Sequence, residues 1–204
     1  MVLTIGFMPL PRFSRLSAEQ RRTILDVARR QFAAYGANTA SYNKIIDAAG
    51  ISKSTAYQYF DGRDDLLGAV LADLRDRIAG LLGDWSPAPS EHAFWQQLRE
   101  GGAQLHRHLA GDPDDLALVD AAADRAPSDR ANPGALWLER MIANGKDLGI
   151  IRGDTEPTLL LASTAAVLQT VDRWAIDRLR TDPETSPAEL EQGYRLLASL
   201  WSET

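Results

Sequence analysis

Apolar residues recur at intervals of three and four along most of this chain, which predicts amphipathic α-helices and no β-strands. The longest stripe, in the segment from about residue 63 to 82, consists of Leu66, Leu67, Val70, Leu71, Leu74, Ile78 and Leu81. Residues 17–20 have the sequence Ser-Ala-Glu-Gln, a capping box that predicts a helix beginning near residue 18. Gly36 is expected to end that helix. The whole pattern predicts an all-α fold of about nine helices.

Two short helical patterns joined by a tight turn occupy residues 39–63. Gly50 lies where the turn requires an unusual φ angle. Ser41 and Ser52 precede the two helices, and each hydroxyl is expected to cap its helix by accepting a backbone N–H. The second helix, about residues 52–59, is short and polar. This is the outline of a helix-turn-helix whose second helix enters the major groove of DNA.

The sequence of this stretch resembles a known family. Residues 49–60, Ala-Gly-Ile-Ser-Lys-Ser-Thr-Ala-Tyr-Gln-Tyr-Phe, are followed by Asp-Gly-Arg-Asp-Asp-Leu-Leu. Together they resemble the DNA-binding signature of the TetR family of bacterial transcriptional regulators, and residues 24–36 resemble that family's first helix. The resemblance covers roughly residues 20–70. Ile46 and Arg63 stand where the family usually has Ala and Lys, but both keep the apolar or cationic character of the position.

The resemblance implies an N-terminal three-helix DNA-binding domain, joined by a long helix to a C-terminal helical bundle for ligand binding and dimerisation. We expect the DNA-binding domain to span residues 17–62 and the second domain residues 63–204. Residues 1–16 show no helical period and are expected to form a flexible arm. The arm either contacts DNA through Arg12 and Arg15 or is disordered.

Charge is distributed unevenly along the 204 residues, whose net charge is −6. Residues 1–63 hold nine Lys and Arg against four Asp and Glu, a net charge of +5. Residues 64–204 hold 13 against 24, a net charge of −11. A basic N-terminal segment followed by an acidic remainder is typical of a protein that presents one face to phosphates.

The first turn of the second helix carries Lys53, which can donate to guanine, and two small hydroxyl residues that can contact bases or phosphates. Tyr57 and Tyr59 resemble family positions that hydrogen-bond phosphates. The alternative for any one of these residues is a solvated face or a helix cap. The residues expected to contact DNA are Ser41, Tyr42, Asn43, Lys44, Ser52, Lys53, Ser54, Thr55, Tyr57, Gln58, Tyr59 and Arg63.

The C-terminal region shows no catalytic constellation and no phosphate-binding glycine loop. The chain has no cysteine, and His106 and His108 would point to different faces of a helix, so no metal or cofactor is expected. Gly101-Gly102 is expected to bend or split the helix predicted from about residue 90 to 110.

The family resemblance implies a small-molecule pocket in this region, although aromatic residues at helical spacing can equally be packing. The candidate ligand-binding residues are Trp95, Leu98, His108, Trp137, Met141, Gln169 and Trp174.

The last two predicted helices carry long apolar stripes that include Tyr194, Leu197 and Trp201. The resemblance implies a homodimer through residues 156–180 and 187–202, and the alternative is an ordinary core within one chain. Two DNA half-sites require two recognition helices in one assembly, which favours the dimer.

We therefore expect a DNA-binding transcriptional regulator, a repressor released from double-stranded palindromic operator DNA by an unknown lipophilic or aromatic effector. No run of 18 apolar residues is present, so no membrane span is expected and the protein is placed in the cytoplasm, at the nucleoid. The alternatives are a constitutive DNA-binding protein without an effector, or a helical enzyme.

Overall fold

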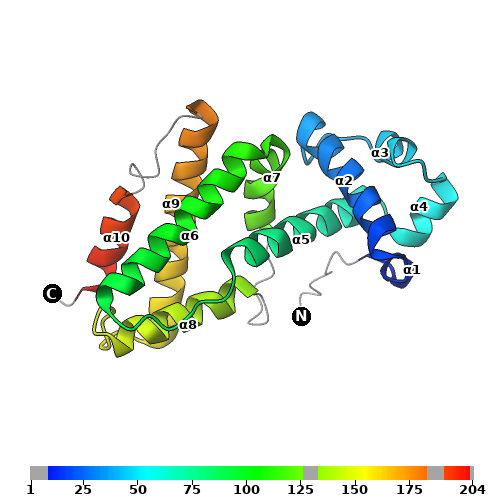
Figure 1. Cartoon of the computed structure of the whole chain (residues 1–204). Coiled ribbons are helices and arrows are strands. Elements are labelled where there is room, and N and C mark those ends of the chain that lie inside the picture. Colours follow the sequence, from blue (N-terminus) through cyan, green and yellow to red (C-terminus); the bar gives the residue numbers. More distant parts are fainter. Residues whose placement is uncertain (1–8, 126–132, 183–190, 203–204) are drawn as a thin grey trace. The chain divides into compact units, whose positions relative to one another are not determined.

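The computed structural model describes residues 9–125, 133–182 and 191–202, and every regular element in these ranges is an α-helix (Figure 1). The expected all-α class is confirmed. In chain order the ten helices of these ranges are α1 (Pro11–Ser14), α2 (Ala18–Tyr35), α3 (Tyr42–Ala48), α4 (Lys53–Tyr59), α5 (Arg63–Leu82), α6 (Glu91–Gly111), α7 (Pro113–Asp124), α8 (Pro133–Asp147), α9 (Pro157–Thr181) and α10 (Glu191–Trp201). Within the described part of the chain, no helix has the length and apolar character needed to span a membrane.

The chain folds into two compact units. Unit 1 consists of residues 1–77 and 112–126, and unit 2 of residues 78–111 and 127–204. This division by compactness differs from the expected boundary at residue 63, because most of α5 and all of α7 belong with the N-terminal helices. The expected division into DNA-binding and ligand-binding domains remains a prediction about function.

Helix α2 begins and ends as the sequence predicts. The Ser17 hydroxyl accepts the backbone N–H of Gln20, and the Gln20 side chain accepts the backbone N–H of Ser17, both at 3.2 Å. Gly36 follows the helix with a φ of 87°, which a residue with a side chain rarely adopts. The apolar face of α2, which includes Ile24 and Phe32, is buried in unit 1.

The described part of the expected flexible arm is instead folded onto α4. The side chain of Phe13 in α1 is buried, and its ring centroid lies 4.6 Å from that of Phe60. The backbone N–H of Leu10 donates to the carbonyl oxygen of Tyr59 at 2.9 Å. The buried aromatic ring and this backbone hydrogen bond together hold the segment against α4. Residues 1–8 lie outside the described residues.

Unit 2 is built around aromatic side chains from several segments. Trp85, Phe94 and Trp201 are buried, and their rings meet edge to face. The Asn144 side-chain oxygen accepts the indole N–H of Trp85 at 3.1 Å and the backbone N–H of Ala88 at 2.7 Å. The Asn144 amide nitrogen donates to the carbonyl oxygen of Ala88 at 3.2 Å, so Asn144 ties the connection between α5 and α6 to α8 through both ends of its buried amide.

Helix α6 runs through Gly101-Gly102 without interruption, so the expectation that the helix is split there is wrong. A Cβ at Gly102 would lie only 2.2 Å from the hydroxyl oxygen of Tyr194. A Cβ at Gly193 would similarly lie 2.3 Å from a methyl carbon of Val171. These glycines therefore allow close approach of neighbouring side chains rather than changes of direction.

Two large residues of the apolar stripes expected at a dimer interface belong instead to the interior of the chain. Leu197 and Trp201 are fully buried, and the indole N–H of Trp201 donates to the Thr164 hydroxyl at 3.1 Å. Tyr194 is half-buried and lines a cavity described below. For these residues the alternative of an intrachain core holds. The expected start of the last helix, at residues 186–187, lies outside the described residues.

Candidate functional site

Helices α3 and α4 form the two-helix element predicted in the N-terminal region. The turn between them contains Gly50 at a φ of 67°. It is closed by the backbone N–H of Ile51, which donates to the carbonyl oxygen of Ile46 at 3.2 Å. The Ser52 hydroxyl accepts the backbone N–H of Thr55 at 3.1 Å and so caps α4 as expected. The geometry is that of a helix-turn-helix.

Most of the predicted DNA-contacting side chains are exposed on this element. Each of these side chains ends in a polar or cationic group, and none is buried in the core of unit 1. The exposed members are Ser41, Asn43, Lys44, Ser52, Lys53, Ser54, Tyr57 and Gln58. Such a face can offer hydrogen bonds and positive charge to base edges and phosphates.

Ser41 does not cap α3, so that expectation is wrong. The residue occupies the N-cap position, but its side chain makes no capping hydrogen bond. The exposed hydroxyl is therefore not engaged in holding the first turn of the helix. This leaves it compatible with the predicted contact to a phosphate.

Tyr42 is placed differently from the exposed residues. Its ring centroid lies 5.6 Å from that of Tyr57, and its hydroxyl oxygen is buried without a hydrogen-bond partner in the described part of the chain. Burial is the main cause that raises the pKa of Tyr42 to about 12, followed by the nearby Tyr57. This placement supports packing beneath Tyr57 as the role of Tyr42, and contact with DNA remains a prediction.

Tyr59 and Arg63 are also partly engaged within unit 1. The Tyr59 ring centroid lies 6.0 Å from that of Phe13. The Arg63 guanidinium donates to the carbonyl oxygen of Ala37 at 2.9 Å and pairs with Asp64. A phosphate at this position would therefore compete with protein partners for Arg63. Thr55, half-buried, is held by the hydroxyl of its cap residue.

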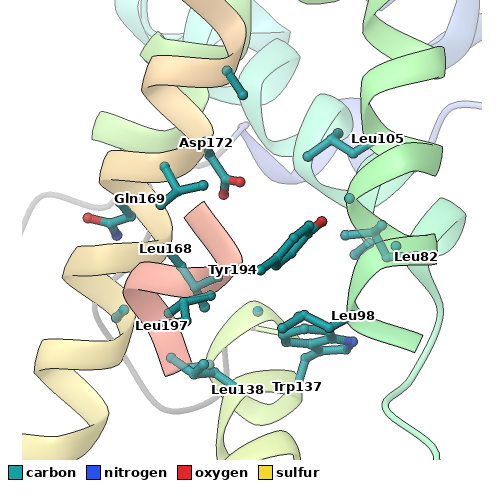
Figure 2. Close-up of a pocket in the computed structure, with 18 of the residues that line it drawn as sticks. Leu82, Leu98, Leu105, Trp137, Leu138, Leu168, Gln169, Asp172, Tyr194 and Leu197 are labelled. Carbon is teal, nitrogen blue, oxygen red and sulfur yellow. The ribbon is translucent and has the colours of Figure 1, made fainter. Parts of the chain in front are cut away.

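A cavity of about 650 Å³ lies in unit 2 between the C-terminal end of α5 and helices α6, α8, α9 and α10 (Figure 2). Its volume falls in the range of ligand pockets, roughly 300–1,000 Å³. Apolar side chains form most of its wall, among them Leu82, Leu98, Leu105, Leu138, Leu168 and Leu197. The space is therefore suited to a lipophilic molecule.

Two polar side chains enter this cavity from the C-terminal helices. Figure 2 shows the Asp172 carboxylate directed inward from α9 and the Tyr194 ring extending across the space from α10. Water can reach Asp172 through the cavity, but the surrounding protein desolvates the carboxylate and raises its pKa to about 6. Burial is also the main cause that raises the pKa of Tyr194 to about 12, and the charge of Asp172 adds to it.

Comparison with known proteins identifies the family. The family described as bacterial regulatory proteins, tetR family, matches residues 24–70, which include the whole helix-turn-helix. An HTH-type transcriptional repressor of Mycobacterium tuberculosis is 34% identical over 106 residues, covering 48% of this chain and 54% of that protein. This chain belongs to the TetR family. It spans about half the length of the curated relatives that it matches.

Solved structures extend the likeness over both units of this TetR-family chain. A TetR family transcription regulator from Marinobacter aquaeolei has a TM-score of 0.65 at 19% identity, covering 91% of this chain and 96% of that one. SmeT, the repressor of the Stenotrophomonas maltophilia multidrug efflux pump SmeDEF, has a TM-score of 0.61 at 18% identity, covering 91% and 88%. At these identities the likeness shows the fold alone.

Three of the predicted ligand residues of this TetR-family protein line the cavity. They are Leu98, Trp137 and Gln169. In Figure 2 the amide of Gln169 points away from the space, so its polar group is not directed at a ligand.

The other predicted ligand residues lie elsewhere. Trp95 packs against Trp201 with ring centroids 5.5 Å apart, and Met141 is completely buried in the core. Trp174 is covered by Arg178, whose guanidinium carbon lies 5.7 Å from the ring centroid. His108 does not line the cavity, and the neighbouring His106 does, because two residues along a helix reverse the direction of a side chain.

Asp172 and Tyr194 were not predicted as ligand residues. The signal for Asp172 is present in the sequence, because residues 161, 165, 168, 172 and 176 of α9 follow helical spacing and all line the cavity. The register alone does not tell which face of the helix meets a pocket and which meets another chain. Only the packing of α9 against α6 and α10 decides this.

Proposed function

We propose that this protein is a DNA-binding transcriptional repressor that a small-molecule ligand releases from its operator. The observation that carries the proposal is the exposed polar face of α4, capped by Ser52 and presenting Lys53 and Tyr57. A recognition helix of this kind enters the major groove, where a lysine can donate to guanine. The name of the Mycobacterium tuberculosis relative supports repression. Action on chromosomal DNA would place the protein in the cytoplasm, at the nucleoid.

A homodimer would read two half-sites of a palindromic operator, about 34–36 Å apart. Large exposed apolar side chains on the last two helices support this assembly. Leu159 in α9 is 58% exposed and Leu196 in α10 is 59% exposed, within the ranges 156–180 and 187–202 expected to form the interface. An interface of this type buries on the order of 2,000 Å² or more.

Ligand control would act through α5. This continuous helix begins at Arg63, directly after the helix-turn-helix, and its C-terminal residue Leu82 lines the cavity. A ligand that binds the DNA-free conformation more tightly than the DNA-bound one would shift the population away from the operator. Operator DNA must then weaken ligand binding by the same factor.

Binding to labelled genomic fragments over a series of salt concentrations tests the proposal. We expect salt-sensitive, sequence-selective binding by the wild-type protein. Lys53→Ala should weaken it by roughly 1–3 kcal/mol and lower the salt dependence by about one counterion. Lys146→Ala, a lysine change in unit 2, is the matched control and should have no such effect. Absence of selective binding by the wild type would remove the proposal.

Two alternatives are weaker. A constitutive DNA-binding protein without an effector needs no cavity, whereas unit 2 contains a partly open cavity of about 650 Å³ lined mainly by apolar side chains. Membership of a family of regulatory proteins argues against a helical enzyme.

A further inference from the structure

The charges around the cavity in unit 2 are one-sided. Its acidic lining residues are Asp84 and Asp172, and no Lys or Arg is among the described residues that line it. His106 adds an imidazole from α6. An organic anion would therefore enter a site with negative charge and no cationic partner in its wall.

The two carboxylates differ in their own partners. Asp84 lies two residues beyond the end of α5, is largely exposed, and pairs with Arg140 at 3.1 Å. Asp172 has no hydrogen bond or ion pair with any described residue, although its carboxylate is directed into an apolar space. A desolvated carboxylate without a partner is unfavourable, and a bound cation would compensate for that cost.

The nearby arginine does not neutralise the Asp172 carboxylate. Arg99 lies over the Tyr194 ring, with its guanidinium carbon 5.6 Å from the ring centroid, but it pairs with Glu191 at 2.8 Å. The Tyr194 hydroxyl is neutral at neutral pH, and burial, which raises its pKa to about 12, keeps it so in more alkaline solution. Asp172 is therefore the one group of the described wall that offers an unpaired negative charge to a ligand.

We propose that this cavity binds lipophilic organic cations and that Asp172 supplies the counter-charge. The apolar wall accepts the hydrocarbon part of such a molecule, and Trp137 adds an aromatic surface. A neutral lipophile would leave the carboxylate unpaired, and a lipophilic anion would be repelled by it. The inference names the ligand class of the effector site and rests on the proposed function for its effect on DNA, but not for the binding itself.

A pair of probes that differ in charge and hardly in shape tests this assignment. Calorimetric titration of the full chain without DNA would compare tetraphenylphosphonium, a cation, with tetraphenylborate, an anion. We expect the cation to bind at least about tenfold more tightly than the anion. Equal affinities, or preference for the anion, would overturn the inference.

Substitutions at Asp172 test whether this residue supplies the counter-charge for the bound cation. Asp172→Asn should weaken tetraphenylphosphonium binding about tenfold or more, whereas Asp172→Glu, which keeps the charge, should retain most of it. Asp177→Asn, at an exposed carboxylate of α9 that pairs with Arg180 and lies outside the cavity wall, is the control and should change the affinity less than about twofold. Circular dichroism would establish that each variant is folded. If the folded Asp172→Asn protein binds the cation as the wild type does, Asp172 is not the counter-charge.

The same probe separates this inference from the proposed function. If tetraphenylphosphonium binds in an Asp172-dependent manner but leaves DNA binding unchanged, the cation site stands and ligand release fails. If neutral or anionic lipophiles release DNA while the cation does not bind, the repressor stands and the cation site fails.

Discussion

The guanidinium of Arg29 and the carboxylate of Asp115 meet with 2.8 Å between Nη1 and Oδ1, which joins α2 to α7 within unit 1. The Asp115 side chain has no exposed surface. Arg77 of α5 donates to the same carboxylate at 2.8 Å. One buried acid therefore connects three helices. This connection explains why α7 belongs to unit 1 with α2 and most of α5. Arg125, the residue after α7, adds a contact with Asn38, which lies 77 residues before Asp115 in the sequence.

Loss of this acid should destabilise unit 1. Asp115→Ala removes the shared partner of two arginines, and we expect the free energy of unfolding to fall by about 3 kcal/mol. This loss of stability lies at the lower end of the range for breaking a buried ion pair, because the side chains of Arg29 and Arg77 are 17% and 36% exposed. Urea titration followed by circular dichroism measures it. Asp73→Ala, which removes only the half-exposed partner of Arg77, should cost less than about 1 kcal/mol. Equal losses in the two variants would contradict a special role for the buried acid.

The neighbouring Tyr42 and Tyr57 of the helix-turn-helix should separate DNA contact from packing. Tyr57→Phe keeps the ring near Tyr42 and removes only an exposed hydroxyl, so DNA affinity should fall by roughly 1–2 kcal/mol without a change in stability. Tyr42→Phe removes a buried hydroxyl that has no hydrogen-bond partner among the described residues. This second change should leave DNA binding intact and raise the free energy of unfolding by up to about 1 kcal/mol. Filter binding and thermal unfolding measure the two effects, and the reverse pattern would assign the DNA contact to Tyr42.

Substitution of two adjacent leucines of α10 by glutamate should disrupt the protein in different ways. Leu196 is 59% exposed, whereas Leu197 is completely buried. Leu196→Glu places a charge in the proposed dimer interface and should give folded monomers. Leu197→Glu places it in the core and should prevent folding. Sedimentation velocity with circular dichroism distinguishes the two results. A Leu196→Glu protein that remains dimeric at micromolar concentration would move the interface away from this face of α10.

Stability should depend on pH through Asp172. Desolvation by the surrounding protein raises the pKa of this group to about 6 in the folded protein, although water reaches it, above the value of about 3.9 for Asp in an unfolded chain. Between these two values the folded state binds more protons than the unfolded state, so stability falls as the pH rises from about 4 to 6. Asp172→Asn removes this effect. The variant should be more stable than the wild type above pH 6 by about 1 kcal/mol, a discounted figure because water reaches the carboxylate.

Thermal unfolding of both proteins from pH 4 to 8 measures the difference. The wall of the cavity also carries Tyr194, His106 and Asp84, so Asp84→Asn serves as the reference for their contribution. A difference that does not grow over this pH range would mean that Asp172 keeps an ordinary pKa.

The sequence alone determined the features that depend on local chemistry. The capping box at Ser17, the left-handed glycine in the turn at Gly50 and the long apolar stripe of α5 each act within a few residues of the chain. Their consequences for helix ends and turns follow from backbone geometry and hydrophobic periodicity. The helix-turn-helix and the family resemblance therefore came from the same short stretch that the comparison matched, residues 24–70.

Only the tertiary structure decided which apolar faces meet each other. The sequence predicts a bend or a split of the helix at Gly101-Gly102, but Gly102 makes room for the hydroxyl of Tyr194, a residue 92 positions away in the sequence. Leu197 was assigned to a dimer interface and lies in the core of its own chain. Helical periodicity gives the direction of each side chain around its own axis, but not the neighbour that covers it. Asp172 shares its helical spacing with apolar residues of α9, but only the packing of that face decides that its charge lies in an apolar cavity, on which the ligand class depends.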